Sequence, residues 1–217
     1  MIRTCILLSL AVMSQSAIAQ TIDSAVAGFV NPSVYWYVVA GYPDGSGQSL
    51  ANCSVNGQPG NATIKVQVRY QGAGVAGIAK ERVRIYLQPW NGDPHQERSC
   101  DSYRHPDADS DAQGWMYITL PNLKLYGQAP TGGGYEFYLT YDRLGTGNHE
   151  RFFYGDKIYF RSPDYDSDGD IDLSDSGFFT SFLNNGVYDA IADFNGDGVE
   201  NITDIGFFTG GMGKSCN

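Results

Sequence analysis

Alternating apolar and polar side chains predict β structure over the first three quarters of the chain. The clearest run spans residues 63–70, in which Ile64, Val66, Val68 and Tyr70 are separated by polar side chains. A period of two places successive side chains on opposite faces of a strand, so this run predicts a strand with one buried face. Further runs of this kind predict strands at 34–40, 83–87, 115–120, 135–141 and 151–160.

Turn-forming residues separate these runs. Glycine, proline, asparagine and aspartate gather at 42–47, 56–61 and 130–134, where they supply the backbone conformations that tight turns need. Six or seven short strands joined by such turns predict a mostly β fold, a β-sandwich over residues 20–163. The order of the strands stays open.

Two segments of this region resemble the immunoglobulin-like repeats of bacterial surface proteins. The first is 75–84, where a glycine-containing turn precedes a strand, and the second is the Asp-rich turn 107–114, which ends in glycine before another strand. The resemblance implies that the β-sandwich is an extracellular domain of immunoglobulin-like type.

The last quarter of the chain repeats itself at an offset of 29 residues. Two acidic stretches of twelve residues, 164–175 and 193–204, are each followed by the same sequence, Gly-Phe-Phe-Thr, and by an apolar segment of helical length. The repeating unit is therefore predicted to be a loop followed by a helix. Asn185 and Gly186 predict a left-handed cap at the end of the first helix.

Both acidic stretches carry oxygen-bearing side chains at the spacing of a calcium loop. Calcium takes six to eight oxygens, which an EF-hand-type loop supplies from positions 1, 3, 5, 7, 9 and 12 around a glycine at position 6. Gly169 and Gly198 occupy that bend. The predicted ligands of two Ca²⁺ sites, with a backbone carbonyl at position 7, are Asp164, Asp166, Asp168, Asp170, Asp172 and Asp175, and then Asp193, Asn195, Asp197, Val199, Asn201 and Asp204.

The charge of the chain gives the same indication. Its formal net charge is −10, and from Asp164 onward eleven acidic residues face Lys214 as the one base. Carboxylates about 5 Å apart repel by a few kcal/mol per pair at an effective dielectric constant near 20, so the tail needs a cation to stay folded. The same charge disfavours nucleic acid and anionic membrane surfaces as partners.

The duplicated loop and helix, with aspartate at position 12, resemble the dockerin module over residues 164–217. Dockerins bind cohesin modules and thereby attach secreted enzymes, often glycoside hydrolases, to a scaffold, so the resemblance implies calcium and a protein partner. Two positions depart from the family. Glu200 stands at position 8 of the second loop in place of an aliphatic residue that pairs the loops. Position 10, where cohesin-reading members carry a hydroxyl side chain, holds Leu173 and Ile202.

No flexible linker precedes the tail, since Arg161, Ser162 and Pro163 connect the last predicted strand directly to Asp164. The two helical segments also hold more apolar side chains than they need for each other. We therefore expect the tail to pack against the β region.

The first residues predict export. Arg3 precedes the apolar run 6–13, and residues 17–19 have the A-x-A pattern of a cleavage site, so residues 1–19 are predicted to be a secretory signal peptide. No other apolar stretch is long enough for a membrane span. We expect a secreted, extracellular protein.

Three cysteines, Cys53, Cys100 and Cys216, follow the predicted signal peptide. Bridges persist in the oxidising compartment that export implies. We favour a Cys53–Cys100 pair, because both residues fall in loops of one predicted domain. A bridge to Cys216 would instead clamp the tail onto the β domain.

Other residues with chemical potential have plainer interpretations. His95, His105 and His149 are scattered, which favours exposed loop histidines over a zinc site or a catalytic triad. An Asp-rich stretch at 107–111 has the spacing of a metal loop, but Ala112 stands at the bend, which favours a hairpin turn over a third, weak calcium site.

The three tryptophans, Trp36, Trp90 and Trp115, could stack on sugar rings, although strand alternation favours places in the core. Trp90, in a loop-like segment, is the best candidate for a glycan contact.

The sequence as a whole predicts a secreted, non-enzymatic calcium-binding protein of extracellular adhesion or assembly. The alternative is an accessory component of a polysaccharide-degrading complex, with a cohesin-binding dockerin and a carbohydrate-binding β domain. A small hydrolase with an unrecognised site is a third class, for which no catalytic residues are predicted.

Overall fold

The structure is a computed structural model that describes residues 21–31, 37–89, 100–101, 103–127 and 135–216. The predicted signal peptide, His95, Trp36 and Trp90 lie outside the described residues. The strands are β1 (Ser24–Phe29), β2 (Tyr37–Ala40), β3 (Cys53–Val55), β4 (Gln58–Gly60), β5 (Ile64–Tyr70), β6 (Ala73–Gly74), β7 (Val83–Pro89), β8 (Trp115–Ile118), β9 (Tyr135–Asp142) and β10 (His149–Arg161). The α helices are α1 (Leu173–Asn185) and α2 (Ile202–Gly211), and short 3-10 turns occupy Leu50–Asn52 and Lys80–Arg82.

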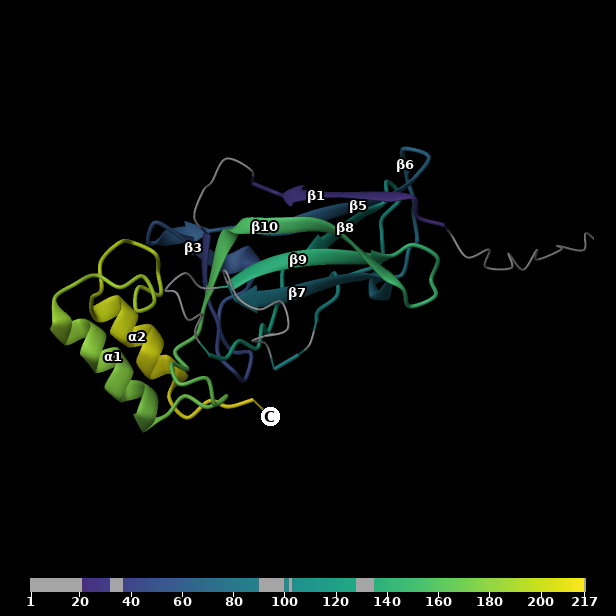
Figure 1. The fold of residues 1–217 in the computed structure, drawn as a ribbon. Coiled ribbons are helices and arrows are strands. Elements are labelled where there is room, and N and C mark those ends of the chain that lie inside the picture. The colour runs from purple at the N-terminus through teal and green to yellow at the C-terminus, as the bar shows by residue number, and fades with distance from the viewer. Residues whose placement is uncertain (1–20, 32–36, 90–99, 102, 128–134, 217) are drawn as a thin grey trace, which may run out of the picture.

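The strands form two sheets, so the described chain is mostly β, as predicted (Figure 1). In the smaller sheet, β5 pairs with β1, β6 and β8, each time antiparallel. The larger sheet has the order β4-β3-β2-β10-β9-β7. Within it β10 and β2 run parallel, and the other described pairs are antiparallel.

One hydrophobic core lies between the two sheets. The smaller sheet contributes Ile64, Val66 and Val68 of β5, and the larger contributes Ile85 and Leu139, all of them buried. The intervening residues of β5 are partly exposed. The period of two therefore predicted the buried face of this strand correctly at Ile64, Val66 and Val68. It was wrong at Tyr70, which is exposed because it ends the strand beside the turn to β6. The finer assignment to the immunoglobulin-like class remains a prediction.

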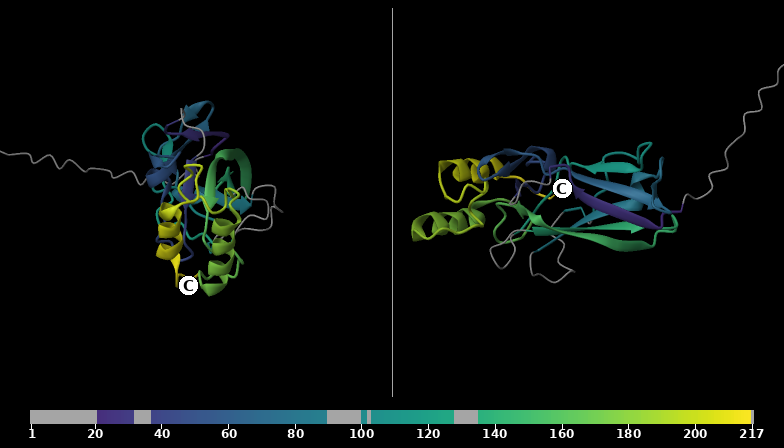
Figure 2. Two further views of the ribbon diagram at one scale, coloured as in Figure 1. Left: turned by 90° about the vertical axis from the view of Figure 1, so that its left-hand side faces the viewer. Right: turned by 90° about the horizontal axis from the view of Figure 1, so that it is seen from above.

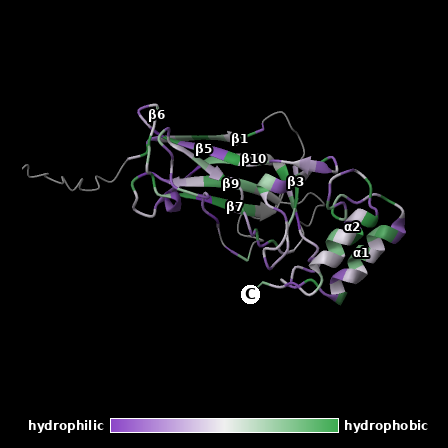
Figure 3. Ribbon diagram, turned by 180° about the vertical axis from the view of Figure 1, so that it is seen from behind, coloured by the Kyte–Doolittle hydropathy of each residue, from purple (hydrophilic) through white to green (hydrophobic). Residues whose placement is uncertain are grey.

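The two helices lie side by side at one end of the sheets (Figures 1 and 2). They enclose a second core, coloured as apolar patches in the helices of Figure 3. Its buried members are Ala40, Ile171, Phe179, Ala192, Phe194 and Phe208. Ala40 belongs to β2, so the tail packs against the larger sheet, as the missing linker predicted.

Tyr42, just after β2, is the closest link between sheet and helices. Its hydroxyl donates to the carbonyl of Phe207 at 2.8 Å. Its ring lies so near α2 that a Cβ on Gly211 would come within 3.0 Å of it and within 2.8 Å of Ile171. Only glycine fits there without a shift of the neighbouring side chains.

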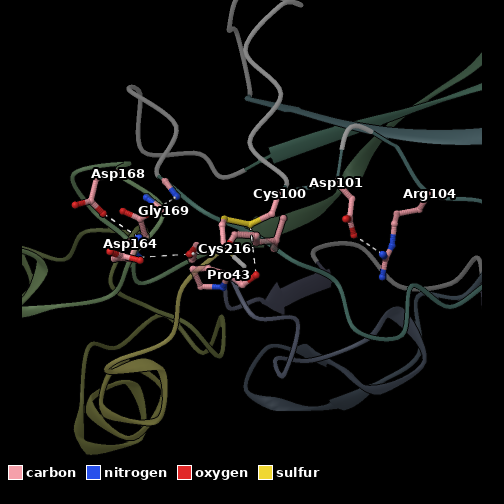
Figure 4. Close-up of a disulfide and its surroundings, with 12 residues drawn as sticks. Pro43, Cys100, Asp101, Arg104, Asp164, Asp168, Gly169 and Cys216 are labelled. Atoms are coloured by element: carbon pink, nitrogen blue, oxygen red, sulfur yellow. Dashed lines mark hydrogen bonds and ion pairs between the residues drawn. A yellow bond between two sulfur atoms is a disulfide. The ribbon is translucent and has the colours of Figure 1, made fainter.

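A disulfide joins Cys100 to Cys216, 116 residues apart, and Cys53 is a free cysteine (Figure 4). The favoured Cys53–Cys100 pair is therefore wrong, and the alternative clamp of the tail onto the β region is correct. Cys53 begins β3 with its side chain buried in the core, and burial raises the pKa of its thiol to about 11. A core thiol of this kind behaves as a small apolar group.

No helix of the described chain combines the length and the hydropathy that a membrane crossing requires.

Candidate metal centre

The first acidic loop wraps its backbone around the Asp164 carboxylate. Asp164 is fully buried, and its oxygens accept hydrogen bonds from the amides of Ser167 at 2.8 Å, Gly169 at 2.9 Å and Gly127 at 3.0 Å. Gly169 turns the chain with φ of 91°, as predicted for position 6. Burial raises the pKa of Asp164 to about 6, although the amides oppose that rise. The loop thus holds a carboxylate whose charge water does not neutralise.

Asp175, at the twelfth position, returns to the start of the loop. One of its oxygens accepts from the amides of Tyr165 at 2.6 Å and Asp166 at 3.3 Å, and the other from Asp172 at 2.8 Å. Asp172 in turn caps α1 by accepting from the amide of Ser174. This capping box fixes both ends of the loop, and burial raises the pKa of Asp175.

Three of the predicted ligands meet in this loop. Carboxylate oxygens of Asp164, Asp166 and Asp168 all lie within 4.8 Å of one another. Asp172 and Asp175 are engaged at the helix start and lie outside this group of three, and the side chain of Asp170 is exposed. Among the described residues, neither of the two salt bridges involves this loop.

The end of the chain covers the first loop. Backbone hydrogen bonds join Ile171 to Lys214 at 2.9 Å and to Gly213 at 2.8 Å, and Cys216 to Gly169 at 2.9 Å. The disulfide to Cys100 anchors the same segment, and Figure 4 shows it beside Gly169 and Asp164. Sequence reasoning raised the disulfide as an alternative but missed these backbone pairs.

The two loops do not pair with each other through the described backbone hydrogen bonds. Position 8 of the first loop, Ile171, is buried and bonds to the chain end instead. Position 8 of the second loop, Glu200, accepts from the amide of Asp189. Position 8 therefore has a different partner in each loop, which agrees with the departure of Glu200 from the dockerin pattern.

The second loop repeats the backbone arrangement of the first. Buried Asp193 accepts from the amides of Asp197 at 3.2 Å and Gly198 at 2.9 Å. Asp204 accepts from Phe194 at 2.8 Å and Asn201 at 2.9 Å, and burial raises its pKa. Gly198, with φ of 84°, makes the bend. The internal repeat of the sequence is thus a repeat of structure.

The side chains of the second loop carry less charge. Asn195 and Asn201 replace carboxylates, and their amide groups donate to Asp197 Oδ2 at 3.0 and 3.3 Å. The Asn201 amide also donates to the carbonyl of Val199 at 3.3 Å. These bonds use oxygens of two predicted ligands, Asp197 and Val199.

A positively charged side chain from the β region also interacts with the second loop. Arg161, the last residue of β10, is 6% exposed, and its charge interacts with Asp193 and Asp204. Burial lowers the pKa of Arg161, while the two acids oppose that change. The Tyr188 hydroxyl adds a hydrogen bond to Asp193 at 2.8 Å. Neither residue was predicted to contact the loop, because neither belongs to the twelve-residue pattern.

The Asp-rich stretch at 107–111 forms a turn, as favoured. Asp107 accepts from Thr119, Asp109 from the amide of Lys80, and Asp111 from the amides that follow it. Their carboxylates thus serve separate backbone donors, and the group of three acids in the tail is the one cation-sized cluster among the described residues.

The two described histidines differ from the expectation of exposed loop residues. His105 is half-buried, with Nδ1 2.8 Å from the carbonyl of Val83. His149 begins β10 and lies 3.3 Å from the Thr140 hydroxyl. Trp115, the one described tryptophan, lies on β8 with the Lys65 ammonium 5.4 Å from its ring centre.

Comparison with known proteins adds no relative. The chain matches no family model, no curated protein and no solved structure. Its function must be argued from its own residues.

Proposed function

We propose that this chain is a secreted, non-enzymatic protein whose tail is folded around two calcium ions and which acts in extracellular adhesion or assembly. The observation that carries the proposal is the repeated cage of backbone amides. In both loops, amides hold the carboxylates of the first and twelfth positions in one arrangement. Two copies of one oxygen-lined loop are what a pair of structural calcium sites requires.

The donor set fits calcium chemically. Every side-chain donor in the first loop is a carboxylate oxygen, and three of these lie within 4.8 Å of one another. Oxygen ligands alone favour a hard cation over zinc or copper, and a large number of protein ligands favours calcium over magnesium. Calcium would neutralise the charge there.

The residues that would hold the ions are those of the sequence pattern. In the first loop they include Asp164, Asp166 and Asp168, with Asp175 completing the set, and in the second loop Asp193 leads the corresponding set. Binding to the folded state alone converts binding free energy into stability, about 2.7 kcal/mol at a calcium concentration of 100 times Kd.

Thermal unfolding with excess calcium and with excess chelator tests the proposal. We expect the melting temperature to fall by several degrees or more in chelator. The double variant Asp168→Ala with Asp197→Ala should melt as the chelated protein does, with or without calcium. Asp170→Ala is the matched control, because position 7 would bind through its carbonyl, and it should keep the calcium response. Superimposable curves for the unmodified protein would overturn the proposal.

A second candidate, a component of a polysaccharide-degrading complex, is favoured by one observation. Leu173 and Ile202 occupy the same position in the two copies and are 82% and 77% exposed. Two matching aliphatic side chains in water suit a protein partner with an apolar surface, such as a cohesin-like module that does not require the usual hydroxyl side chain at position 10. Capture on a cohesin panel should then be lost in Leu173→Glu with Ile202→Glu and kept in Val187→Glu, which alters another exposed aliphatic residue.

A further inference from the structure

The outer face of the larger sheet gathers arginine and tyrosine side chains across β7, β9 and β10. The strand register places Arg84 and Arg151 on either side of Thr140, and Tyr86 beside Tyr138. Their neighbours along β7 and β9, such as Ile85 and Leu139, point into the core. Strand alternation therefore turns this set to the opposite face, away from the core. We call it the arginine–tyrosine face, with Tyr103 as its sixth member.

The rings of this face are stacked on one another and on the guanidinium groups. Tyr86 and Tyr138 lie parallel with centroids 4.8 Å apart, and the Arg151 guanidinium lies 3.9 Å from the Tyr138 centroid. Tyr103 packs beside Tyr86 at 5.7 Å, and Arg84 lies 4.2 Å from the Tyr103 centroid. Because β7 and β10 flank β9, both faces of the Tyr138 ring are covered.

This arrangement suits an anion better than the flat face of a neutral sugar. Covered rings offer their edges, which carry partial positive charge, while their faces are already used. A guanidinium that stacks on a ring keeps its N–H groups free to bind a carboxylate side-on. The face is thus rigid and rich in hydrogen-bond donors.

Among the described residues, the two arginines have no anionic partner of their own. Within this part of the chain, neither the Arg84 nor the Arg151 side chain forms a salt bridge or a hydrogen bond, and Arg84 Nε is buried without a partner. The nearby acid Asp142 is already committed, since its oxygens accept from three amides of the turn that follows it. The positive charge of the face is therefore available to a ligand.

The face continues into an open hollow of about 710 Å³. Its lining includes Tyr103, His105, Lys80 and Arg104 together with the acids Asp101 and Asp107, and Arg104 forms a salt bridge with Asp101. The segment around Arg104 pairs with β7 at Ile85, so four neighbouring backbone segments form the track. Neighbouring segments lie about 4.8 Å apart, so the three spacings make the track roughly 14 Å long. That length is enough for several units of an extended polymer.

We propose that the arginine–tyrosine face binds an acidic polysaccharide that bears a carboxylate on its sugar units. The arginines would pair with the carboxylates, and the tyrosine hydroxyls and histidine nitrogens, which can donate and accept, would bind sugar hydroxyls. An acidic peptide would gain its backbone hydrogen bonds at a sheet edge, whereas this track crosses a sheet face. The proposal uses no calcium-loop residue and is independent of the function proposed above.

Titration calorimetry with a pentamer of galacturonic acid, in calcium buffer, tests the proposal. We expect binding that weakens with salt, and a loss of affinity of about tenfold or more in Arg84→Gln and in Arg151→Gln. Arg69→Gln is the matched control, because Arg69 lies on β5 in the other sheet and should leave affinity unchanged. Tyr86→Phe keeps the ring stack and removes one hydroxyl, so it should bind a few-fold more weakly with an unchanged melting temperature.

Two comparison ligands make the test specific. The methyl ester of the same pentamer should bind at least about tenfold more weakly, and polyglutamate should not compete at equal charge. Equal binding of the ester, equal binding of polyglutamate or no binding of the pentamer would each overturn the proposal. Binding that survives in both arginine variants would do the same, since it would point to calcium bridging through the tail.

Discussion

The two acidic loops share a backbone and differ in how their charge is balanced. In the first, all five predicted side-chain ligands are aspartates, and three of their carboxylates meet within 4.8 Å. In the second, two of the five are asparagines whose amides donate to Asp197. Arg161, from β10, adds a buried positive charge beside Asp193 and Asp204.

The two copies of the repeat thus balance the repulsion between their carboxylates in different ways. The second loop carries internal compensation from the sheet, so we expect it to keep its shape without metal. The first loop is closed by the chain end and the Cys100–Cys216 disulfide but has no internal cation among the described residues. An ion from solution would be needed to balance its charge, and we expect it to bind calcium more tightly.

Replacing Arg161 by methionine should have the largest effect. The change leaves the buried Asp193 and Asp204 without the positive charge that interacts with them, and an uncompensated buried charge costs about 3–5 kcal/mol. Denaturant unfolding in chelator should show a loss of about 3 kcal/mol. Calcium should then restore more stability to the variant than it adds to the unmodified protein. If calcium adds the same amount to both proteins, Arg161 does not stand in for a metal.

Replacing Cys216 by serine should come next, with a loss of about 2–4 kcal/mol for a bridge that closes a long loop. Because the bridge anchors the segment over the first loop, hydrogen exchange should quicken at the amides of Ser167 and Gly169 more than at those of Asp197 and Gly198. Cys53→Ala, which alters the unpaired cysteine, should leave this pattern unchanged. Equal acceleration in both loops would show that the disulfide does not distinguish them.

Replacing the aspartate at position 5 by asparagine should change the free energy of unfolding in opposite directions in the two loops, by about 1 kcal/mol each in chelator. Asp168→Asn keeps an oxygen for the amide of Asp170 and removes a repelling charge, so it should stabilise the metal-free protein. Asp197→Asn cannot serve both the Val199 amide and the two asparagine amides, so it should destabilise it. Chemical denaturation of both variants measures these changes in stability. A change in the same direction for both variants would contradict the difference between the loops.

The smallest expected effect is a dependence of stability on pH, whose direction calcium reverses. Asp164 binds its proton more tightly folded, with a pKa of about 6, than unfolded, with a pKa near 3.8. The stability that this proton gives is present at about pH 4 and is lost as the pH rises through about 6. The melting temperature of the metal-free protein should therefore fall as the pH rises over this range. With excess calcium the trend should reverse, because protons and metal compete for the carboxylates.

The sequence predicted those elements whose pattern is local. The period of two revealed β5 and β7, and the glycines at the loop bends and at the cap of α1 took the positive φ predicted for them. The same pattern missed β1, whose small residues and exposed Val26 interrupt the alternation. It also missed β3 and β4, because three residues are too few to show a period.

The candidate sites were predictable only as far as the chain carries them in one stretch. Each loop holds its own oxygens, so spacing was enough to name them. Arg161 and the chain end reach the loops through tertiary packing, which no local pattern records. The arginine–tyrosine face was visible only as the polar half of two strands, because stacking between Tyr86 and Tyr138 depends on strand order.

The snug fit of Tyr42 against Gly211 bears on how this tail can be used in other proteins. A helix pair cut out at Pro163 would leave Phe208 and Ile171 without the sheet residues that shield them from water. Grafted onto an unrelated partner, it should aggregate or melt early unless β2 and Tyr42 travel with it. The tail therefore needs the sheet residues that cover its core and cannot serve as an independent, interchangeable tag.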